Sequence, residues 1–147
     1  MKHLEFKTEI AADKKKVWNT MLNPETYKKW AGVAWPGSYF EGFWAKGEKI
    51  RFISPGQGGT LAELKEQKPY DTILAEQIAV INPDGSEDRT SKVAQGWIGT
   101  TERYTFKEQN GKTKLVVEIN TPPSWADMFV DGWPKALEKL KDMCEKN

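Results

Sequence analysis

The segment from Pro122 to Asn147 constrains the fold most, because it follows a long run of strand-like segments and has the spacing of one amphipathic helix. Its apolar residues recur every three or four positions and so fall on one helical stripe: Trp125, Phe129, Val130, Trp133, Leu137, Leu140 and Cys144. A helix of about 23 residues is roughly 34 Å long, about the length of a ten-residue strand. One such helix can cross a whole sheet without filling all the space beneath it. We therefore expect a pocket for a hydrophobic ligand there, and a kink near Trp133 because Pro134 lacks a backbone donor.

The N-terminal third predicts one strand and two short helices. Leu4, Phe6, Thr8 and Ile10 alternate with polar residues, which is typical of a half-buried strand. Asp13 is placed to cap a first helix that has an apolar face. Asn23 and Pro24 end that helix and begin a second one, which we expect to extend through Trp30.

The middle of the chain has the pattern of consecutive strands. We expect them at Ser38–Ala45, Glu48–Ser54, Thr60–Gln67, Asp71–Ile81, Trp97–Glu108 and Lys112–Thr121. The polar stretch Asn82–Gly96 is either a loop or the tip of an extended hairpin. Short turns between consecutive strands favour an antiparallel sheet. The expected fold class is therefore α+β, with a curved antiparallel sheet of about six to seven strands around a long C-terminal helix.

Composition excludes several classes of protein. The 147 residues fit a single domain, 1–147, and 22 basic against 21 acidic residues leave a net charge of +1. The sequence has no basic stripe, so we expect no nucleic-acid partner. No apolar run approaches the ~20 residues of a membrane span, so we expect no such span. The N-terminus carries no apolar core of a signal peptide. One cysteine, Cys144, rules out an internal disulfide, so we expect a cytoplasmic protein.

The residues offer few routes to catalysis. His3 is the only histidine and lies far along the chain from Cys144, so we predict no nucleophile–histidine pair, no metal site and no cofactor. Glu76 and Glu102 are the candidate catalytic residues. A carboxyl group that points into an apolar cavity has a raised pKa and can act as an acid or base. The alternative is that both side chains face solvent, as half of the positions on a one-faced sheet do.

Seven tryptophans form the other prominent signal. They either fill the core or supply flat, rigid walls to a cavity. Under the second interpretation, the predicted ligand-binding residues are Phe40, Trp44, Phe52, Leu74, Glu76, Tyr104, Trp125, Phe129 and Trp133. Glu76 would orient a polar group of the ligand, because its strand parity places it with Leu74. Trp30 and Trp35 are expected near an entrance.

Four motifs occur in the order and spacing of a known superfamily. They are Ile10–Trp18, Asn23–Trp30, Gly47–Phe52 followed by Pro55–Gly59, and Gly132-Trp133 followed by Leu137 and Leu140. From Phe6 to Leu140 the chain resembles the START/birch-pollen-allergen superfamily, also called SRPBCC. Within it, the chain is most similar to single-domain homologues of the C-terminal domain of the heat-shock-protein-90 ATPase activator.

This resemblance implies a helix-grip fold, in which an antiparallel sheet curls around the terminal helix and encloses a cavity for apolar molecules. It implies no single activity, because the superfamily includes carriers, cyclases and cochaperone domains. Three functions follow as hypotheses. The first is binding of a small hydrophobic or amphipathic molecule. The second is a cochaperone-like interaction with a protein partner, which an exposed apolar surface at Trp30 and Trp35 would favour. The third is a cyclase or hydratase that uses Glu76 or Glu102.

Overall fold

One antiparallel sheet holds every strand of the described residues. The computed structural model describes residues 1–146, and its strands are β1 (Lys2–Ile10), β2 (Tyr39–Gly42), β3 (Lys49–Ser54), β4 (Gly58–Lys68), β5 (Thr72–Ile81), β6 (Glu87–Asp88), β7 (Thr101–Gln109) and β8 (Lys112–Thr121). Their order across the sheet is β1-β8-β7-β5-β4-β3-β2, and the two-residue β6 pairs with the end of β5. All pairs are antiparallel, which confirms the predicted α+β class.

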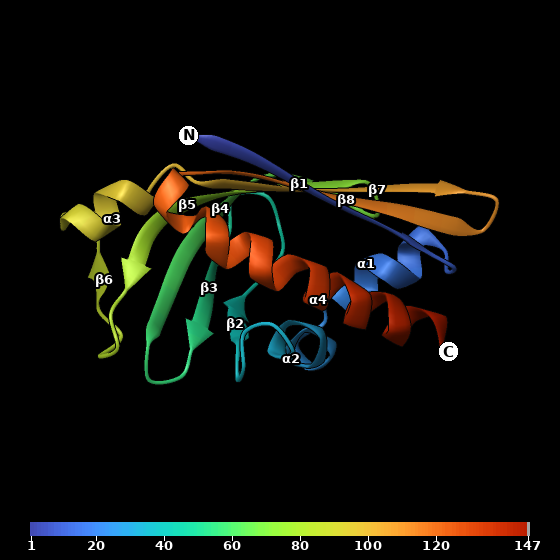
Figure 1. Ribbon diagram of the computed structural model, residues 1–147, viewed down its shortest axis with the longest axis horizontal. Helices are drawn as coiled ribbons and strands as arrows, with labels where there is room; N and C mark the ends of the chain where they lie inside the picture. Colours follow the sequence, from blue (N-terminus) through green and yellow to red (C-terminus); the bar gives the residue numbers. More distant parts are fainter. Residues whose placement is uncertain (147) are drawn as a thin grey trace.

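The remaining elements are α1 (Lys14–Leu22), α2 (Pro24–Gly32), α3 (Lys92–Trp97), the one-turn 3-10 helix η1 (Pro123–Trp125) and α4 (Ala126–Glu145). Figure 1 shows α4 lying along the sheet, with β7 and β8 on one side of it and β2 and β3 on the other. α1 and α2 pack against α4. This is the expected arrangement of a curved sheet around a terminal helix. Among the described residues, no helix combines the length and the apolar character needed to cross a membrane.

The two short helices begin where the sequence predicts. The Asp13 carboxylate accepts a hydrogen bond from the Lys16 backbone N–H at 2.7 Å, which caps α1. The Asn23 side chain accepts from Glu25 N–H at 2.9 Å, and Pro24 occupies the first turn of α2. α2 continues to Gly32, two residues beyond the expected end at Trp30.

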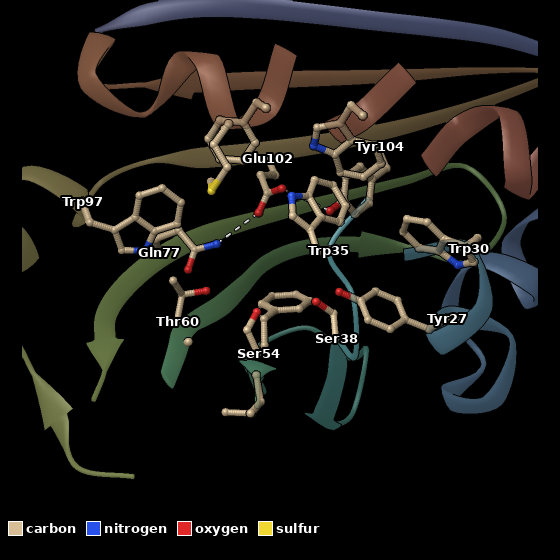
Figure 2. Close-up of a pocket in the computed structure, with 16 residues that line it drawn as sticks. Tyr27, Trp30, Trp35, Ser38, Ser54, Thr60, Gln77, Trp97, Glu102 and Tyr104 are labelled. Carbon is tan, nitrogen blue, oxygen red and sulfur yellow. Dashed lines mark hydrogen bonds between the residues drawn. The ribbon is translucent and has the colours of Figure 1, made fainter. Parts of the chain in front are cut away.

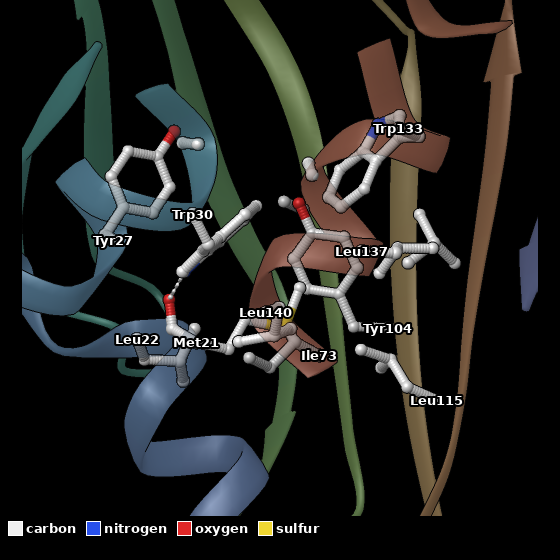
Figure 3. Close-up of a cluster of buried hydrophobic side chains, with 14 of the residues drawn as sticks. Met21, Leu22, Tyr27, Trp30, Ile73, Tyr104, Leu115, Trp133, Leu137 and Leu140 are labelled. Atoms are coloured by element: carbon white, nitrogen blue, oxygen red, sulfur yellow. Dashed lines mark hydrogen bonds between the residues drawn. The ribbon is translucent and has the colours of Figure 1, made fainter. Parts of the chain in front are cut away.

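The core lies between the sheet and α4. Leu137 and Leu140 of α4 pack with Met21 of α1, Trp30 of α2 and Leu115 of β8 (Figure 3). The Trp30 indole also donates to the Met21 carbonyl at 3.1 Å, so this buried ring has its polar atom paired. Burial of these side chains fixes α4 on the sheet at the end where α1 and α2 lie.

α4 differs from the sequence expectation in three respects. It begins at Ala126, because residues Pro123–Trp125 form η1 instead. Val130 is not on the buried stripe: it is 45% exposed, since it lies about 100° around the helix from Phe129. The helix also continues through Pro134 without an interruption. The carbonyl that Pro134 leaves without a helical donor is that of Val130, on the exposed side, where water can donate to it. Asn147 lies outside the described residues.

The segment between β5 and β7 contains a helix that the sequence interpretation missed. The stretch interpreted as a loop or hairpin tip contains β6 and α3, and Trp97 ends α3 rather than beginning a strand. The residue in the sequence that marks the start of this helix is Ser91. Its hydroxyl accepts a hydrogen bond from the Ala94 N–H at 3.1 Å and caps α3. β7 therefore starts at Thr101. The consequence for the site is that α3 carries the buried Trp97 ring to the end of the sheet.

Candidate functional site

A cavity of about 160 Å³ lies between α4 and the sheet (Figure 2). β5 contributes Gln77 to its lining, β7 contributes Glu102 and Tyr104, and β3 contributes Phe52. The helices contribute further aromatic rings: Tyr27 and Trp30 from α2, Trp97 from α3, and Phe129 and Trp133 from α4. Trp35 comes from the segment between α2 and β2. Met128 of α4 also lines the cavity and is 40% exposed, so the cavity reaches the surface there.

Glu102 is the one acidic residue in the lining, which contains no basic residue, and it is only 8% exposed. Alternation along β7 directs its side chain to the same face as Tyr104. Gln77 Nε2 donates to Glu102 Oε2 at 3.0 Å, and the Tyr104 hydroxyl donates to Oε1 at 3.4 Å (Figure 2). Burial raises the pKa of Glu102 to about 7, although the two hydrogen bonds act in the opposite direction. The carboxyl group is therefore poised to gain or lose a proton near neutral pH.

Aromatic rings pack on one another around this carboxyl group. The Trp133 ring contacts Trp30, Trp35 and Tyr104, with ring centroids 5.9, 5.6 and 5.8 Å apart. At the other end of the cavity, Trp97 stacks on Phe129 with centroids 6.0 Å apart. These contacts hold the rings rigidly, as aromatic packing does in protein cores. The cavity thus has flat, fixed walls.

Three buried polar atoms of the lining residues have no hydrogen-bond partner within the described part of the chain. They are Gln77 Oε1, Trp97 Nε1 and Trp133 Nε1. Most buried polar atoms in proteins are paired, because an unpaired one costs about 1–3 kcal/mol. Three further atoms of this kind, on Trp44, Thr100 and Thr121, belong to residues outside the lining.

The structure brings together about half of the predicted ligand-binding residues. Phe52, Tyr104, Phe129 and Trp133 line the cavity, as does the candidate acid Glu102. Phe40, Trp44 and Trp125 do not. Trp44 packs behind the wall, with its ring 5.8 Å from Phe52 and 5.6 Å from Phe40. The Trp125 ring packs on the lining residue Trp97, at a centroid distance of 5.0 Å.

Leu74 and Glu76 lie on the opposite face of β5, so their predicted place in the cavity is wrong. The inner face of β5 carries Ile73, Ala75 and Gln77. A shift of register against β4 then leaves Ile78 unpaired, so Ala79 and Ile81 lie on the outer face, where they pack with Leu61. The larger Leu74 lies on the outer face with Glu76, and both are half-buried. The small Ala75 on the inner face leaves room for the aromatic rings, and this reversed the parity expected from hydrophobicity alone.

Two lining residues, Gln77 and Trp97, are not among the ligand-binding residues predicted from the sequence. Gln77 is the single polar residue among the fully buried positions of β5 and is 2% exposed. Its position between Ala75 and Ala79 was the available signal, because a lone amide in an apolar alternation needs a partner. Trp97 was assigned to a strand rather than to α3. We expected Trp30 and Trp35 near an entrance, and both line the cavity. Trp30 is buried, whereas Trp35 is half-buried.

Gly132 of α4 permits the close approach of Trp35. A Cβ added at Gly132 would lie 2.6 Å from Trp35 Cζ2. We expect Gly132→Ala to displace the Trp35 ring and to lower the free energy of unfolding by about 1 kcal/mol, because overpacking outweighs the gain in helix preference. Urea unfolding followed by tryptophan fluorescence measures this.

The matched control is Gly96→Ala in α3, where no atom lies within 4 Å of the added Cβ. That variant is expected to be unchanged or up to about 1 kcal/mol more stable. A Gly132→Ala protein as stable as the control would contradict the close approach of Trp35 to α4.

On the outer face of β1 and β8, His3, Glu5 and Glu118 bring potential metal-ligating atoms within 4.8 Å of one another; within residues 1–146 no other such group occurs. His3 Nε2 lies 3.7 Å from a Glu118 oxygen. The Glu5 carboxylate, however, already pairs with Lys7 at 2.8 Å. Such exposed pairs are common on protein surfaces and contribute little, so we assign this group no function.

Comparison with known proteins places the fold among solved structures. The chain is similar to the Aha1 dimer from Colwellia psychrerythraea, with 18% identity and a TM-score of 0.72 over 99% of this chain and 97% of that one. It is also similar to a protein from Mesorhizobium loti, with 14% identity and a TM-score of 0.76 over 97% and 96%. A protein from Arthrobacter aurescens gives 16% identity and a TM-score of 0.76 over 99% and 87%. At these identities the likeness concerns the fold alone. No curated protein matches the chain.

The family model described as activator of Hsp90 ATPase homolog 1-like protein matches residues 11–145. The match spans the capped helices, strands β2 to β8 and all of α4, which include the elements that build the cavity. The chain therefore belongs to the family of activator of Hsp90 ATPase homolog 1-like proteins.

Proposed function

We propose that this protein binds one small hydrophobic or amphipathic molecule in the cavity beneath α4. The observation that supports this most is the cavity of about 160 Å³ with unpartnered polar atoms in its aromatic wall. A dry cavity of about 150 Å³ accommodates benzene in another protein, whereas drug-sized ligands occupy roughly 300–1,000 Å³. The expected guest is thus the size of a single ring, and sterols and fatty acids are too large.

The polar atoms of the wall favour an amphipathic guest over a purely apolar one. The indole N–H groups of Trp97 and Trp133 need acceptors, and Gln77 Oε1 needs a donor. A hydroxyl group satisfies both kinds of partner. A single-ring alcohol can therefore bury its ring against the aromatic walls and pair its oxygen with the buried polar atoms.

The test is a thermal-shift and calorimetric series with benzyl alcohol, a naphthyl alcohol and cholesterol. We expect benzyl alcohol to bind and to raise the melting temperature, as any ligand of the native state does. The two larger alcohols should not bind. If the protein does not bind benzyl alcohol in this series, the proposal is overturned.

The control pair changes threonine to phenylalanine on the two faces of the sheet. Thr60→Phe fills part of the cavity, which Thr60 lines, and is expected to abolish binding. Thr105→Phe adds the same ring on β7, next in sequence to Tyr104 and so on the opposite face, and is expected to leave binding unchanged.

A second candidate function is acid–base chemistry at Glu102. A carboxyl group whose pKa burial raises to about 7 suits proton transfer near neutral pH. Glu76 does not line the cavity, because it lies on the other face of β5. The family description supports a chaperone-binding role as well. The apolar surface that would favour that role is largely buried, since Trp30 is only 2% exposed.

A further inference from the structure

The lining of the cavity combines a cage of aromatic rings with one buried acid. Half of the lining side chains are aromatic, and Glu102 is the only acidic one; lysine, arginine, histidine and aspartate are absent from the lining. Glu102 forms no ion pair within residues 1–146, and its two partners, Gln77 and Tyr104, are neutral. A buried carboxylate without a positive partner is costly. The lining therefore offers a carboxyl group and no positively charged side chain to balance its charge.

From this lining we propose that the guest of the cavity is a small organic cation of the alkylammonium class, held against the indole faces with Glu102 as its counter-ion. The inference rests on the proposed function, because it names the ligand class of the same cavity. An anionic guest would meet the Glu102 carboxylate and no basic side chain. A neutral guest would leave the Glu102 charge without a partner.

The aromatic walls suit a cation as well as an apolar ring. A cation over the face of tryptophan or tyrosine within about 6 Å of the ring centroid is attracted by the ring, most strongly when it is desolvated. Trp30, Trp35 and Tyr104 surround Trp133 at one side of the cavity, and Trp97 lies at the other. Methyl groups on nitrogen pack against such rings as an apolar group does. A quaternary ammonium ion of single-ring size therefore matches both the shape and the charge of the cavity.

The protonation of Glu102 then controls affinity. Binding of a cation requires the ionised carboxylate, and burial raises the pKa of Glu102 to about 7. The other titratable groups facing it are the Tyr27 and Tyr104 hydroxyls, whose pKa values burial also raises, so both stay neutral. A quaternary ammonium ion does not titrate. We therefore expect its affinity to increase about tenfold between pH 6 and pH 8, in proportion to the ionised fraction of Glu102.

The experiment compares choline with 3,3-dimethylbutan-1-ol, an uncharged molecule of the same shape, by calorimetry. At pH 8 we expect choline to bind the wild-type protein at least tenfold more tightly than the alcohol. Glu102→Gln keeps the shape of the side chain and removes the charge, so it should lose the preference for choline and still bind the alcohol. The control Glu76→Gln changes a carboxylate on the other face of β5 and should retain the preference.

The outcomes separate the two proposals. Binding of the alcohol or of benzyl alcohol without binding of choline would overturn the cation and leave the proposed function standing. Equal affinity of choline for the wild type and for Glu102→Gln would overturn Glu102 as the counter-ion. Absence of binding by all three probes would overturn both proposals.

Discussion

Glu102→Gln is expected to stabilise the protein at alkaline pH by about 3 kcal/mol relative to the wild type. In the wild type, burial raises the pKa of Glu102 from 4.5 in the unfolded chain to about 7 in the folded state. Between these values the folded state holds a proton that the unfolded state has released. Stability from this group is thus fully present below pH 4.5 and is lost as the pH rises through 7. A difference of about 2.5 pKa units corresponds to about 3 kcal/mol.

Urea unfolding of both proteins at pH 5 and pH 8.5 measures this effect. The wild type should lose free energy of unfolding between the two values relative to Glu102→Gln, whose residue 102 does not titrate. Glu76→Gln is the control, because that carboxylate lies on the outer face of the sheet. If Glu102→Gln shows the same pH dependence as the wild type, the carboxyl group is not buried as described.

Trp133→Ala is expected to lower the free energy of unfolding by about 3–5 kcal/mol. Trp133 is 3% exposed, and its ring contacts Trp30, Trp35 and Tyr104. Its removal leaves a large void next to a cavity that already exists, so the surrounding rings lose contacts on a second side. Chemical unfolding at pH 7 gives the loss directly.

Trp133→Phe separates the ring from its polar atom. It retains an aromatic ring and removes an indole N–H that has no partner among the described residues. Its expected loss is less than half that of Trp133→Ala, because deleting an unpaired buried donor offsets part of the lost packing. A loss below about 1 kcal/mol for Trp133→Ala would contradict the central place of this ring.

Local chemistry explains why much of the fold was predictable. Asp13 and Asn23 cap helices through their own side chains, so the helix starts depend on neighbouring residues only. Asn110 and Gly111 both have positive φ, at 55° and 78°, and form the turn between β7 and β8 that their sequence predicts. The apolar spacing of Phe129, Trp133, Leu137 and Leu140 likewise placed α4 on the sheet.

The site was less predictable because it depends on which face of each strand lies inside. On β5 the inner face carries the small Ala75, and the larger Leu74 lies outside. Hydrophobicity alone therefore selected the wrong face and, with it, Glu76 instead of Gln77. The pairing of β4 with β5 adds two shifts of register, one that leaves Ile78 of β5 unpaired and one that leaves Lys65 of β4 unpaired, and no local pattern reveals them. Cavity volume depends on how the rings pack across the whole core, and spacing along the chain does not encode it.

The central claim is that the space beneath α4 admits a guest, and the indole N–H resonances of Trp97 and Trp133 test it most directly. Both nitrogens are buried, belong to rings that line the cavity, and lack a partner among residues 1–146. In an NMR titration with benzyl alcohol, with assignments from Trp97→Phe and Trp133→Phe, we expect both resonances to shift and saturate together. Resonances that stay unmoved at saturating benzyl alcohol would contradict the account.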